Sequence, residues 1–237
     1  MDNLEQLIAN YQPTKQTAEL VSRMKIVLFV GISGAGKDTI KSQLLKTSDC
    51  LDLITCTTRA PRTNDGVPEV EGRAYYFIDK PTAIDMIESR QYAEVSLVHG
   101  EINGSSIDEL RRLLALDKIA LADIDVQGLA KYKKLSESII SIFILPPDYT
   151  TWLQRLKSRY STSEAFEAAW PKRRASAIRE LTQALGVSYY HFVINDEIDR
   201  AVRIVDEIAR RDEIFHRKDD EARLRARDLL AAIQMSS

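Results

Sequence analysis

The sequence contains few of the residues that form disulfide frameworks and metal centres. It has two cysteines, Cys50 and Cys56, and three histidines among 237 residues. Neither cysteine stands at the spacing of a zinc site, and the histidines are too scattered to build one. Both cysteines lie in or beside a stretch that is typical of a core strand. We therefore expect buried, reduced thiols and a reducing compartment.

The sequence also lacks a long apolar run and an excess of one charge. No stretch approaches the ~18 apolar residues that span a membrane, and the N-terminus carries Asp2 and Glu5 instead of a signal-peptide core. We therefore expect a cytoplasmic protein without a membrane partner. Lysine and arginine number 33 against 35 aspartates and glutamates, so the net charge of −2 gives no basic field that favours nucleic acid.

What remains is the composition of a globular α/β protein. The hydrophobic fraction is 44% and the charged fraction 29%, which excludes general disorder. Apolar strand patterns alternate with helical patterns, which predicts a parallel sheet covered by helices on both faces. The expected strands are 26–30, 51–58, 119–125, 139–145 and 191–194, and the expected helices are 107–116, 126–134, 149–160, 163–185 with a break or kink at Pro171, and 198–214.

One stretch has the features of a phosphate-binding loop. It follows the apolar run 26–30 and precedes Ile40, Leu44 and Leu45, whose spacing is that of an amphipathic helix. Glycines let the backbone turn tightly, so that its N–H groups converge on an anion, and a lysine adds charge at the β- and γ-phosphates. The loop consists of Gly31, Ile32, Ser33, Gly34, Ala35, Gly36, Lys37, Asp38 and Thr39.

Asp38 departs from the usual motif, in which a serine or threonine after the lysine places a hydroxyl on Mg²⁺. Here the hydroxyl comes one residue later, at Thr39. One interpretation is that Asp38 only stabilises the first turn of its helix. The interpretation that we favour is a Mg²⁺ ligand, direct or through water, because a carboxylate beside a triphosphate needs a cation between them. Thr39 is then able to bond a phosphate oxygen.

A block of about residues 59–104 interrupts the alternation with short antiparallel pieces. It opens with Arg59 and Arg62 around Pro61, a rigid fork for a second anionic group. The block is predicted to be an insertion over the sheet, as a substrate lid would be. Within it we expect a loop at 63–72, strands at 75–78 and 92–98, a helix at 82–89 with Thr82 as N-cap, and a turn at 100–105.

The two ends lie outside the alternating pattern. Residues 1–24 are predicted to form two short helices, broken at Pro13, that pack on the outside of the domain. Residues 213–237 alternate in charge around apolar positions such as Leu229 and Ile233. This pattern predicts a solvated or loosely docked amphipathic helix, with a self-association surface as the alternative.

Six motifs stand in a fixed order along the chain: the loop 31–39, TTRAPR at 57–62, GRAYYF at 72–77, DIDVQG at 123–128, IFILPP at 142–147 and VIND at 193–196. Together they resemble the guanylate kinase family, enzymes that move a phosphoryl group from ATP to GMP. The resemblance covers about residues 25–210. It implies a P-loop nucleoside monophosphate kinase fold for residues 25–212, with the GMP-binding insertion at 59–104 and a mobile helical lid at about 155–175.

The resemblance also implies roles for individual residues. Lys37 and the lid arginines Arg155, Arg159 and Arg173 act on the transferring phosphoryl group, and Asn195 lies near the adenine of ATP. Arg59, Arg62 and Tyr75 hold the GMP phosphate; Thr55, Glu94 and Ser105 read the guanine, with Asp125 nearby. Mg²⁺ accompanies ATP, with Asp38 and Asp123 as its predicted ligands. Phosphoryl transfer needs positioning and positive donors rather than a covalent nucleophile, and these residues supply such donors.

Three departures from the family pattern bear on these roles. Asn103 stands where the family usually has a tyrosine, which weakens or replaces one contact to the GMP phosphate. The loop between Arg62 and Tyr75 is longer than usual. The segment between Arg159 and Arg173 is longer too, so Arg174 is a second candidate for the lid arginine. Simpler interpretations are that Arg155 and Arg159 form surface ion pairs, that Tyr75 is core, and that Asp123 and Asp125 cap the next helix.

Three functions follow from this pattern. The leading one is an ATP-dependent kinase of GMP and dGMP, acting as a monomer or homodimer on small-molecule substrates. The second is a related kinase with another nucleotide or a sugar phosphate as acceptor; Asn103 allows this, and Glu94 argues against it. The third is a catalytically inactive protein-binding module. Such modules typically lose the loop lysine and glycines, which this chain keeps.

Overall fold

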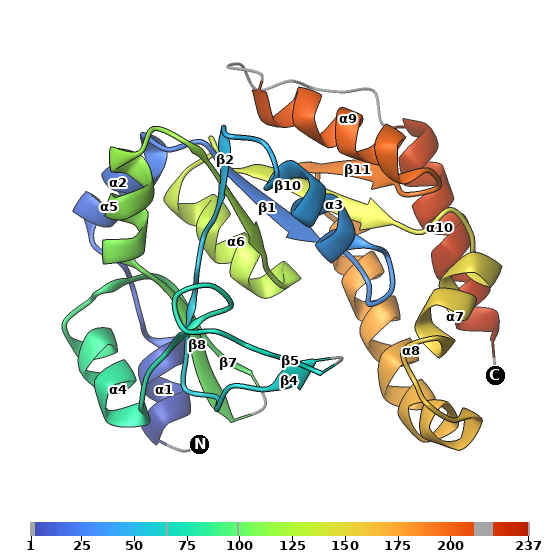
Figure 1. The fold of residues 1–237 in the computed structure, drawn as a ribbon, viewed down its shortest axis with the longest axis horizontal. Coiled ribbons are helices and arrows are strands. Elements are labelled where there is room, and N and C mark those ends of the chain that lie inside the picture. The colour runs from blue at the N-terminus through green and yellow to red at the C-terminus, as the bar shows by residue number, and fades with distance from the viewer. Residues whose placement is uncertain (1–2, 65, 99, 211–219, 237) are drawn as a thin grey trace. The chain divides into compact units, whose positions relative to one another are not determined.

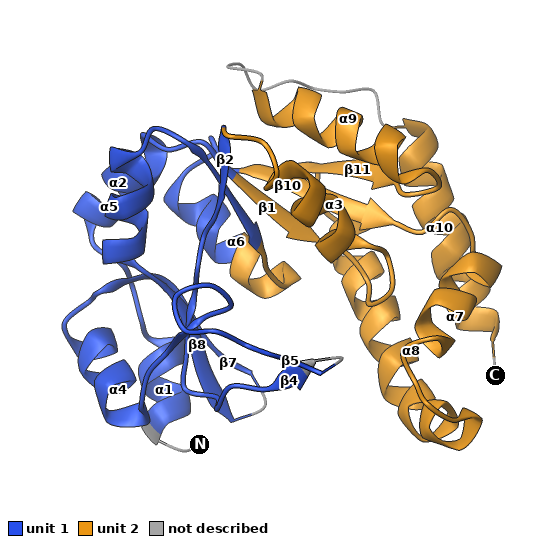
Figure 2. Ribbon diagram, in the orientation of Figure 1, with its two compact units in different colours: residues 1–26, 49–122, 130–139 blue, residues 27–48, 123–129, 140–237 orange. Residues whose placement is uncertain are grey.

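The structure of the protein, a computed structural model, describes residues 3–64, 66–98, 100–210 and 220–236 (Figure 1). The chain forms two compact units, and each unit is built from three separate stretches of the sequence (Figure 2). Unit 1 comprises residues 1–26, 49–122 and 130–139, and unit 2 comprises residues 27–48, 123–129 and 140–237. We describe each unit by itself.

Unit 2 contains three parallel strands in the order β11-β10-β1. They are β1 (Ile26–Val30, in unit 2 from Val27 onwards), β10 (Ile140–Leu145) and β11 (Tyr190–Ile194). Every residue of β1 is buried. Because successive side chains point to opposite faces of a sheet, both faces of β1 are covered, as the continuous apolar run predicts.

Helices of unit 2 pack on these strands and on one another. Helix α3 (Lys37–Leu44) contacts α9 (Ile198–Arg210), and α9 lies against β10 and β11. Helix α10 (Asp220–Met235) contacts β11, α7 (Tyr149–Lys157) and α8 (Ser163–Leu185). The C-terminal helix is therefore docked, with Ala222, Ala226, Leu229 and Ile233 buried. Residues 211–219, the junction between α9 and α10, lie outside the described part of the chain.

Helix α8 continues through Pro171 without interruption, although the proline predicted a break or kink. A proline inside a helix removes one N–H donor and crowds the preceding turn, but its φ angle is compatible with the helix.

In unit 1, strand β2 (Cys50–Asp52) pairs in parallel with β9 (Ile119–Asp123), and a separate small sheet has the order β6-β3-β8-β7. The strands of this small sheet are β6 (Tyr76–Phe77), β3 (Cys56–Thr57), β8 (Glu101–Ser106) and β7 (Tyr92–Val98). A short hairpin joins β4 (Thr63–Asn64) to β5 (Val67–Pro68). The helices are α1 (Asn3–Ala9), α2 (Lys15–Ser22), α4 (Lys80–Glu88), α5 (Ile107–Ala115) and α6 (Val126–Leu135), which enters unit 1 at Ala130.

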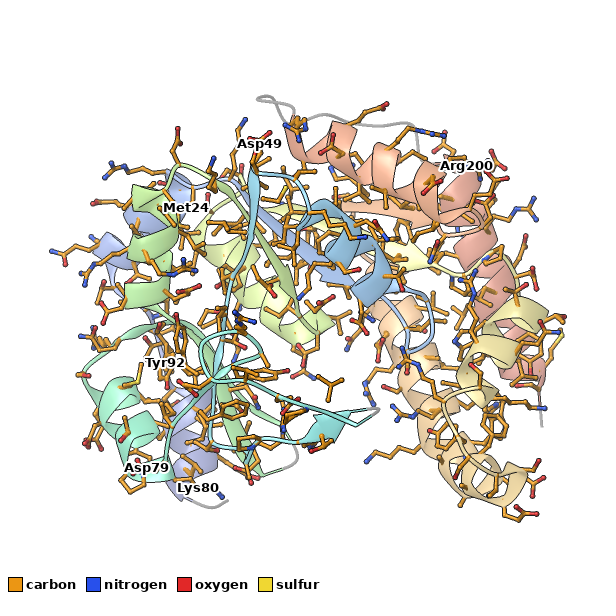
Figure 3. All side chains as sticks on the ribbon, viewed as in Figure 1. Met24, Asp49, Asp79, Lys80, Tyr92 and Arg200 are labelled. Atoms are coloured by element: carbon orange, nitrogen blue, oxygen red, sulfur yellow. The ribbon has the colours of Figure 1, made fainter. Side chains whose placement is uncertain are left out.

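The two N-terminal helices exist as predicted, but they do more than cover the outside. Ile8 of α1 belongs to the hydrophobic core under the small sheet, together with Cys56, Ile87, Tyr92 and Ile102. Tyr92 is fully buried in unit 1 (Figure 3). Three further residues of the N-terminal segment, Leu4, Leu7 and Tyr11, pack against the same core.

Several local predictions in the insertion are wrong in detail. The expected turn at 100–105 is strand β8, and the expected loop at 63–72 contains the β4–β5 hairpin. Helix α4 is capped by Asp79 instead of Thr82, and the side chain of Asp79 accepts the N–H of Thr82 (Figure 3). The strand expected at 51–58 divides into β2 and β3, because the N–H of Ile54 bonds the carboxylate of Glu109 instead of a strand.

Both cysteines are free and buried, as predicted. In the described part of the chain, no helix is long and apolar enough to cross a membrane.

Candidate active site

The loop between β1 and α3 has the backbone of a phosphate-binding loop. Gly31, Gly34 and Gly36 all have positive φ angles, of 143°, 87° and 93°. A Cβ atom at Gly31 would lie 2.4 Å from the carbonyl oxygen of Ile144, and one at Gly36 would lie 2.1 Å from the amide nitrogen of Asn195. Both the conformation and the close contacts therefore require glycine at these two positions.

Lys37 begins α3 and folds back over the loop. Its Nζ atom donates a hydrogen bond of 2.5 Å to the carbonyl oxygen of Gly31. Burial lowers the pKa of Lys37, and the negative charges of Asp123, Asp38 and Glu180 oppose this shift. The amine is thus held beside the loop amides. An anionic ligand bound there would accept hydrogen bonds from both the amine and the backbone N–H groups.

Asn195 follows β11 and fixes the same loop. Its side chain is 5% exposed, and its Nδ2 atom donates to the carbonyl oxygen of Ala35 at 2.8 Å. The backbone oxygen of Asn195 accepts hydrogen bonds from Nη1 and Nη2 of Arg155, each at 3.1 Å. In this structure Asn195 links the loop to α7, a role that its predicted place near adenine did not include.

The arginines predicted for the lid occupy different surroundings. Arg155 of α7 contacts Asn195, and Arg159, which follows α7, donates to the hydroxyl of Ser33 at 3.3 Å. Arg173 bonds the hydroxyl of Tyr160 at 2.9 Å. Arg174 instead bonds the C-terminal end of α10, through the carbonyl oxygens of Ile233 and Gln234 and the hydroxyl of Ser236. These contacts favour Arg173 over Arg174 as the lid arginine.

Two carboxylates meet the chemical requirements of a Mg²⁺ site. One oxygen of Asp123 pairs with Lys41 at 2.7 Å, while its Oδ1 atom is buried without a hydrogen-bond partner in the described part of the chain. The side chain of Asp38 is 78% exposed and lies 3.9 Å from Arg159. The described residues hold no cluster of three metal-ligating side chains. Mg²⁺ in kinases usually binds one or two carboxylates together with phosphate and water, so these residues fit such an ion.

Two further predicted residues of unit 2 are exposed. Thr39 lies on the first turn of α3 with its side chain exposed. Asp125 accepts the N–H of Gly128 at 2.7 Å, and so it caps helix α6, as the simpler interpretation held.

In unit 1, Arg59 is held by a carboxylate that the sequence analysis did not single out. Its Nη1 and Nη2 atoms donate to Glu69 at 2.8 and 3.0 Å, and this pairing raises the pKa of Arg59 further. The guanidinium also lies over the ring of Tyr75, 5.1 Å from its centroid. Glu69 accepts the backbone N–H of Arg62 as well, at 2.8 Å. One carboxylate thus fixes both arginine positions, while the side chain of Arg62 is exposed.

Glu94 and Ser105 are brought together as the resemblance implied. They face each other across β7 and β8, both buried, and the Ser105 hydroxyl donates to the Glu94 carboxylate at 3.3 Å. Thr55, partly buried, precedes β3, and its carbonyl oxygen accepts the N–H of Tyr76 at 2.9 Å. Asn103 lies on β8 opposite Ser96. A paired buried carboxylate of this kind can recognise a ligand that offers adjacent N–H donors.

Two more glutamates, Glu180 and the buried Glu109, support these groups, and the sequence analysis did not single them out. Glu180 of α8 accepts from Ser176 at 2.7 Å, and burial raises its pKa despite the nearby Lys37. The helical spacing from Ala177 to Leu181 and Ala184 placed Glu180 on a buried face, and this signal was available in the sequence. Glu109 of α5 accepts from Ile54, Tyr76 and Arg112 and so anchors the backbone next to Thr55. No comparable pattern marks Glu69.

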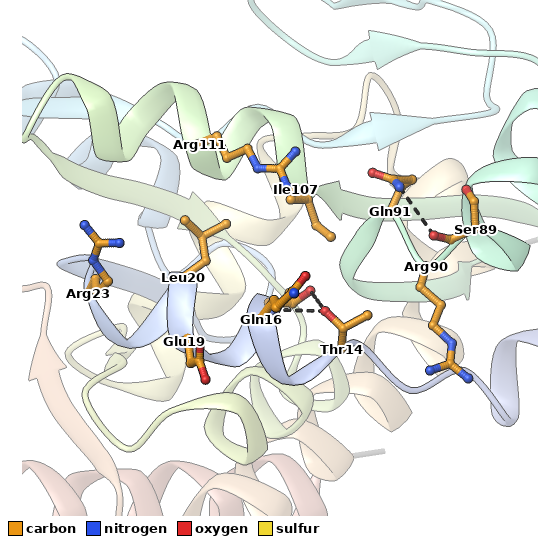
Figure 4. A pocket seen from close by; sticks show the side chains of 11 residues that line it. Thr14, Gln16, Glu19, Leu20, Arg23, Ser89, Arg90, Gln91, Ile107 and Arg111 are labelled. Atoms are coloured by element: carbon orange, nitrogen blue, oxygen red, sulfur yellow. Dashed lines mark hydrogen bonds between the residues drawn. The ribbon is translucent and has the colours of Figure 1, made fainter.

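A cavity of about 430 Å³ lies elsewhere in unit 1, between α2, α5 and the turn after α4 (Figure 4). Residues such as Leu20, Arg23, Arg90 and Arg111 line it. None of the predicted site residues does, so this cavity does not locate the candidate active site.

Comparison with known proteins matches most of the chain to one family. The family model described as guanylate kinase matches residues 23–212. The guanylate kinase of Anaeromyxobacter dehalogenans is 34% identical over 194 residues, which cover 80% of this chain and 82% of that protein. The guanylate kinase of Rickettsia felis is 32% identical over 193 residues, covering 80% and 96% of the two chains. Among solved structures, guanylate kinase from Anaplasma phagocytophilum superposes with a TM-score of 0.57 at 23% identity, covering 78% of this chain and 84% of that one, which supports the same fold.

Proposed function

The chain belongs to the guanylate kinase family, and from this premise we propose that it transfers the γ-phosphoryl group of ATP to GMP or dGMP. It is an ATP-dependent nucleoside monophosphate kinase. The observation that carries the proposal is the intact donor loop, in which three glycines have positive φ angles and the amine of Lys37 bonds the carbonyl oxygen of Gly31. An inactive binding module does not need this arrangement, because its loop and lysine would not bind a phosphate.

The donor nucleotide is assigned to unit 2. The backbone amides of the loop 31–39 and Lys37 bind the β- and γ-phosphates, and Arg155, Arg159 and Arg173 neutralise charge on the transferring group. Asn195 holds the loop in shape through Ala35. Asp123 and Asp38 would hold Mg²⁺, which, bound with ATP, offsets the charge of the β- and γ-phosphates. Unit 2 thus binds and orients the donor.

The acceptor nucleotide is assigned to unit 1. Arg59, Arg62 and Tyr75 bind its phosphate, and the Arg59–Glu69 pair keeps the guanidinium in a fixed orientation. The carboxylate of Glu94 accepts from the N1–H and 2-amino groups of guanine, assisted by Ser105 and Thr55. Adenine offers neither donor, so AMP would lack both of these hydrogen bonds to the carboxylate of Glu94.

We place this reaction in the cytoplasm, with small-molecule substrates and with neither nucleic acid nor membrane as partner, in a monomer or homodimer. The balanced charge of the chain supports the absence of a nucleic-acid partner.

A coupled assay of ADP release tests the assignment. The wild-type protein is supplied with ATP and Mg²⁺ and with GMP, dGMP, AMP, CMP, UMP or a sugar phosphate in turn. We expect GMP to be the best acceptor, with a preference over AMP of as much as ~10⁴-fold in kcat/KM. If another acceptor is used as well as GMP, the family assignment stands but the assignment of GMP as the substrate is wrong. Asn103 in place of the usual tyrosine would then explain the change. If ADP is not released with any of the acceptors, the kinase assignment is wrong.

A further inference from the structure

The N-terminal segment before residue 23 lies outside the stretch that matches the family, yet it reaches the strand that carries Glu94. Tyr11 follows α1 and packs against the core under the small sheet. Its hydroxyl oxygen accepts the backbone N–H of Tyr92 at 3.0 Å, and its hydroxyl donates to the backbone carbonyl of the same residue. One side chain therefore satisfies both backbone groups of Tyr92.

These backbone groups lie at an irregularity in strand β7. Tyr92 pairs with Ser106 and Glu94 with Ser105, so three residues of β7 oppose two of β8. An extra residue of this kind forms a β-bulge, which disrupts the ladder locally and re-aims the side chains next to it. Strand β7 is the edge strand of its sheet, and the Tyr11 hydroxyl binds the backbone groups of Tyr92 directly beside this bulge.

The surroundings leave the bulge little freedom to move. Tyr92, Glu94 and Ser105 are 0%, 5% and 1% exposed. A Cβ atom at Gly104 would lie 2.7 Å from the carbonyl oxygen of Glu94 and 2.8 Å from the ring of Tyr92. Because these groups touch the backbone of β8 so closely, a shift of Tyr92 changes the position of Glu94 two residues later.

We propose that Tyr11 is a positioning residue for base recognition: its hydroxyl holds the β-bulge at Tyr92 and thereby aims the carboxylate of Glu94 at the guanine. The inference rests on the proposed function of Glu94. It assigns the N-terminal segment a part in acceptor specificity, in addition to its apolar packing.

The substitution Tyr11→Phe tests this, because it keeps the ring and removes only the hydroxyl. Losing the hydrogen bonds at a partly buried site should raise KM for GMP roughly 3- to 10-fold and lower the GMP-over-AMP preference to a similar extent. KM for ATP and kcat at saturating GMP should stay within about twofold of wild type, since the substitution does not touch unit 2.

Two control variants separate positioning from general loosening. Tyr190→Phe in β11 also removes a buried tyrosine hydroxyl, one without a hydrogen-bond partner among the described residues, and should leave both KM values unchanged. Leu7→Ala weakens the packing of α1 against the same core while keeping Tyr11. It should lower the thermal midpoint without shifting KM for GMP. An equal KM shift in Leu7→Ala would show that loose packing, not the hydroxyl, is responsible.

Glu94→Ala is measured beside these variants. If Glu94→Ala loses the preference for GMP and Tyr11→Phe behaves like wild type, the inference about Tyr11 is wrong and the proposed function stands. If Glu94→Ala keeps the preference, the base-reading role of Glu94 is wrong, and the inference falls with it. If Tyr11→Phe shifts KM for both nucleotides equally, the hydroxyl is structural only.

Discussion

Lys37 donates to the carbonyl oxygen of Gly31 within its own loop, so phosphate binding has to exchange this bond for one to the ligand. The amine is already desolvated, as its lowered pKa indicates. A pre-desolvated charge interacts more strongly with a developing negative charge than a hydrated one does. The loop therefore stores its main electrostatic donor in place before the nucleotide arrives.

Lys37→Ala should accordingly reduce kcat by a factor on the order of 10²–10³ while the protein stays folded. Steady-state kinetics together with a thermal melt measures both. Lys46→Ala is the matched control, since the side chain of Lys46, just after α3, is exposed and bonds the side chain of Gln43. Near-normal turnover of Lys37→Ala would contradict the mechanism.

Asp38 is mostly exposed and lies 3.9 Å from Arg159. If it is a Mg²⁺ ligand, Asp38→Asn should raise the Mg²⁺ concentration needed for half-maximal rate, and Asp38→Ser, with the usual hydroxyl, should keep substantial turnover. Initial rates against free Mg²⁺ at saturating ATP and GMP measure this. Superimposable curves for all three proteins would mean that Asp38 only stabilises its helix.

At the scale of elements, α8 carries two adjacent arginines with separate tasks. Arg173 bonds Tyr160 near the start of the helix, whereas Arg174 bonds the last carbonyl groups of α10. Carbonyl groups at a helix end have no partner within the helix, and a cationic side chain there both pairs them and complements the helix dipole. Neighbouring residues thus serve the proposed reaction and the docking of the C-terminal helix.

Arg174→Ala should therefore lower the free energy of unfolding by roughly 1–2 kcal/mol with little effect on kcat. Arg173→Ala should do the reverse, with lower kcat and nearly unchanged stability. Urea denaturation and steady-state kinetics of the two variants form one experiment. If Arg174→Ala lowered kcat without lowering the stability of the protein, Arg174 would be the lid arginine instead of Arg173.

Elements whose signals are local could be predicted from the sequence, and elements made by distant pairing could not. The strand 26–30, the glycine loop and α3 are consecutive, so their pattern was complete within one stretch. Residues such as Asn103, Gly104 and Ser105 favour a turn, but they lie in strand β8. This strand forms a hairpin with β7, which ends shortly before it, and also pairs with β3, far away in sequence. Position 104 requires glycine because the ring of Tyr92 approaches its backbone closely, and not because the chain turns there.

The candidate site divides in the same way. The resemblance named Glu94 and Ser105, which the structure brings into contact. The supporting carboxylates Glu69 and Glu109 were not named, because their function is to hold residues that lie next to them only in the folded chain. The bond from Asn195 to Ala35 joins residues 160 positions apart, which no local pattern reveals.

At the scale of the whole molecule, burial of thiols and phenols couples stability to alkaline pH. Burial raises the pKa of Cys56 from 9.0 to about 11, and the pKa of Tyr92 rises for the same reason. Because the unfolded thiol ionises first, the stabilising contribution of Cys56 is fully present below pH 9 and is lost as the pH rises through 11.

The free energy of unfolding should therefore fall between pH 9 and pH 11, with Cys56 contributing at most about 1.4 kcal/mol per pH unit. Urea denaturation of wild type and Cys56→Ala at three values across this window measures the contribution. The stability difference between the two proteins should shrink as the pH rises. A constant difference would show that the buried thiol does not titrate in this range.

The alternating division of the chain between the units has a consequence for synthesis on the ribosome. The last residue of unit 1 is Ile139, whereas unit 2 still needs β10, α7, α8, β11, α9 and α10 at that point. A nascent chain whose residue 139 has cleared the exit tunnel thus carries the complete sequence of unit 1, while the glycine loop still lacks two of its three parallel strands. Domains generally fold during translation as their residues emerge. The order of emergence then lets the sheet that carries Glu94 and Ser105 form first, and the glycine loop can acquire its final shape only once Asn195 has been translated.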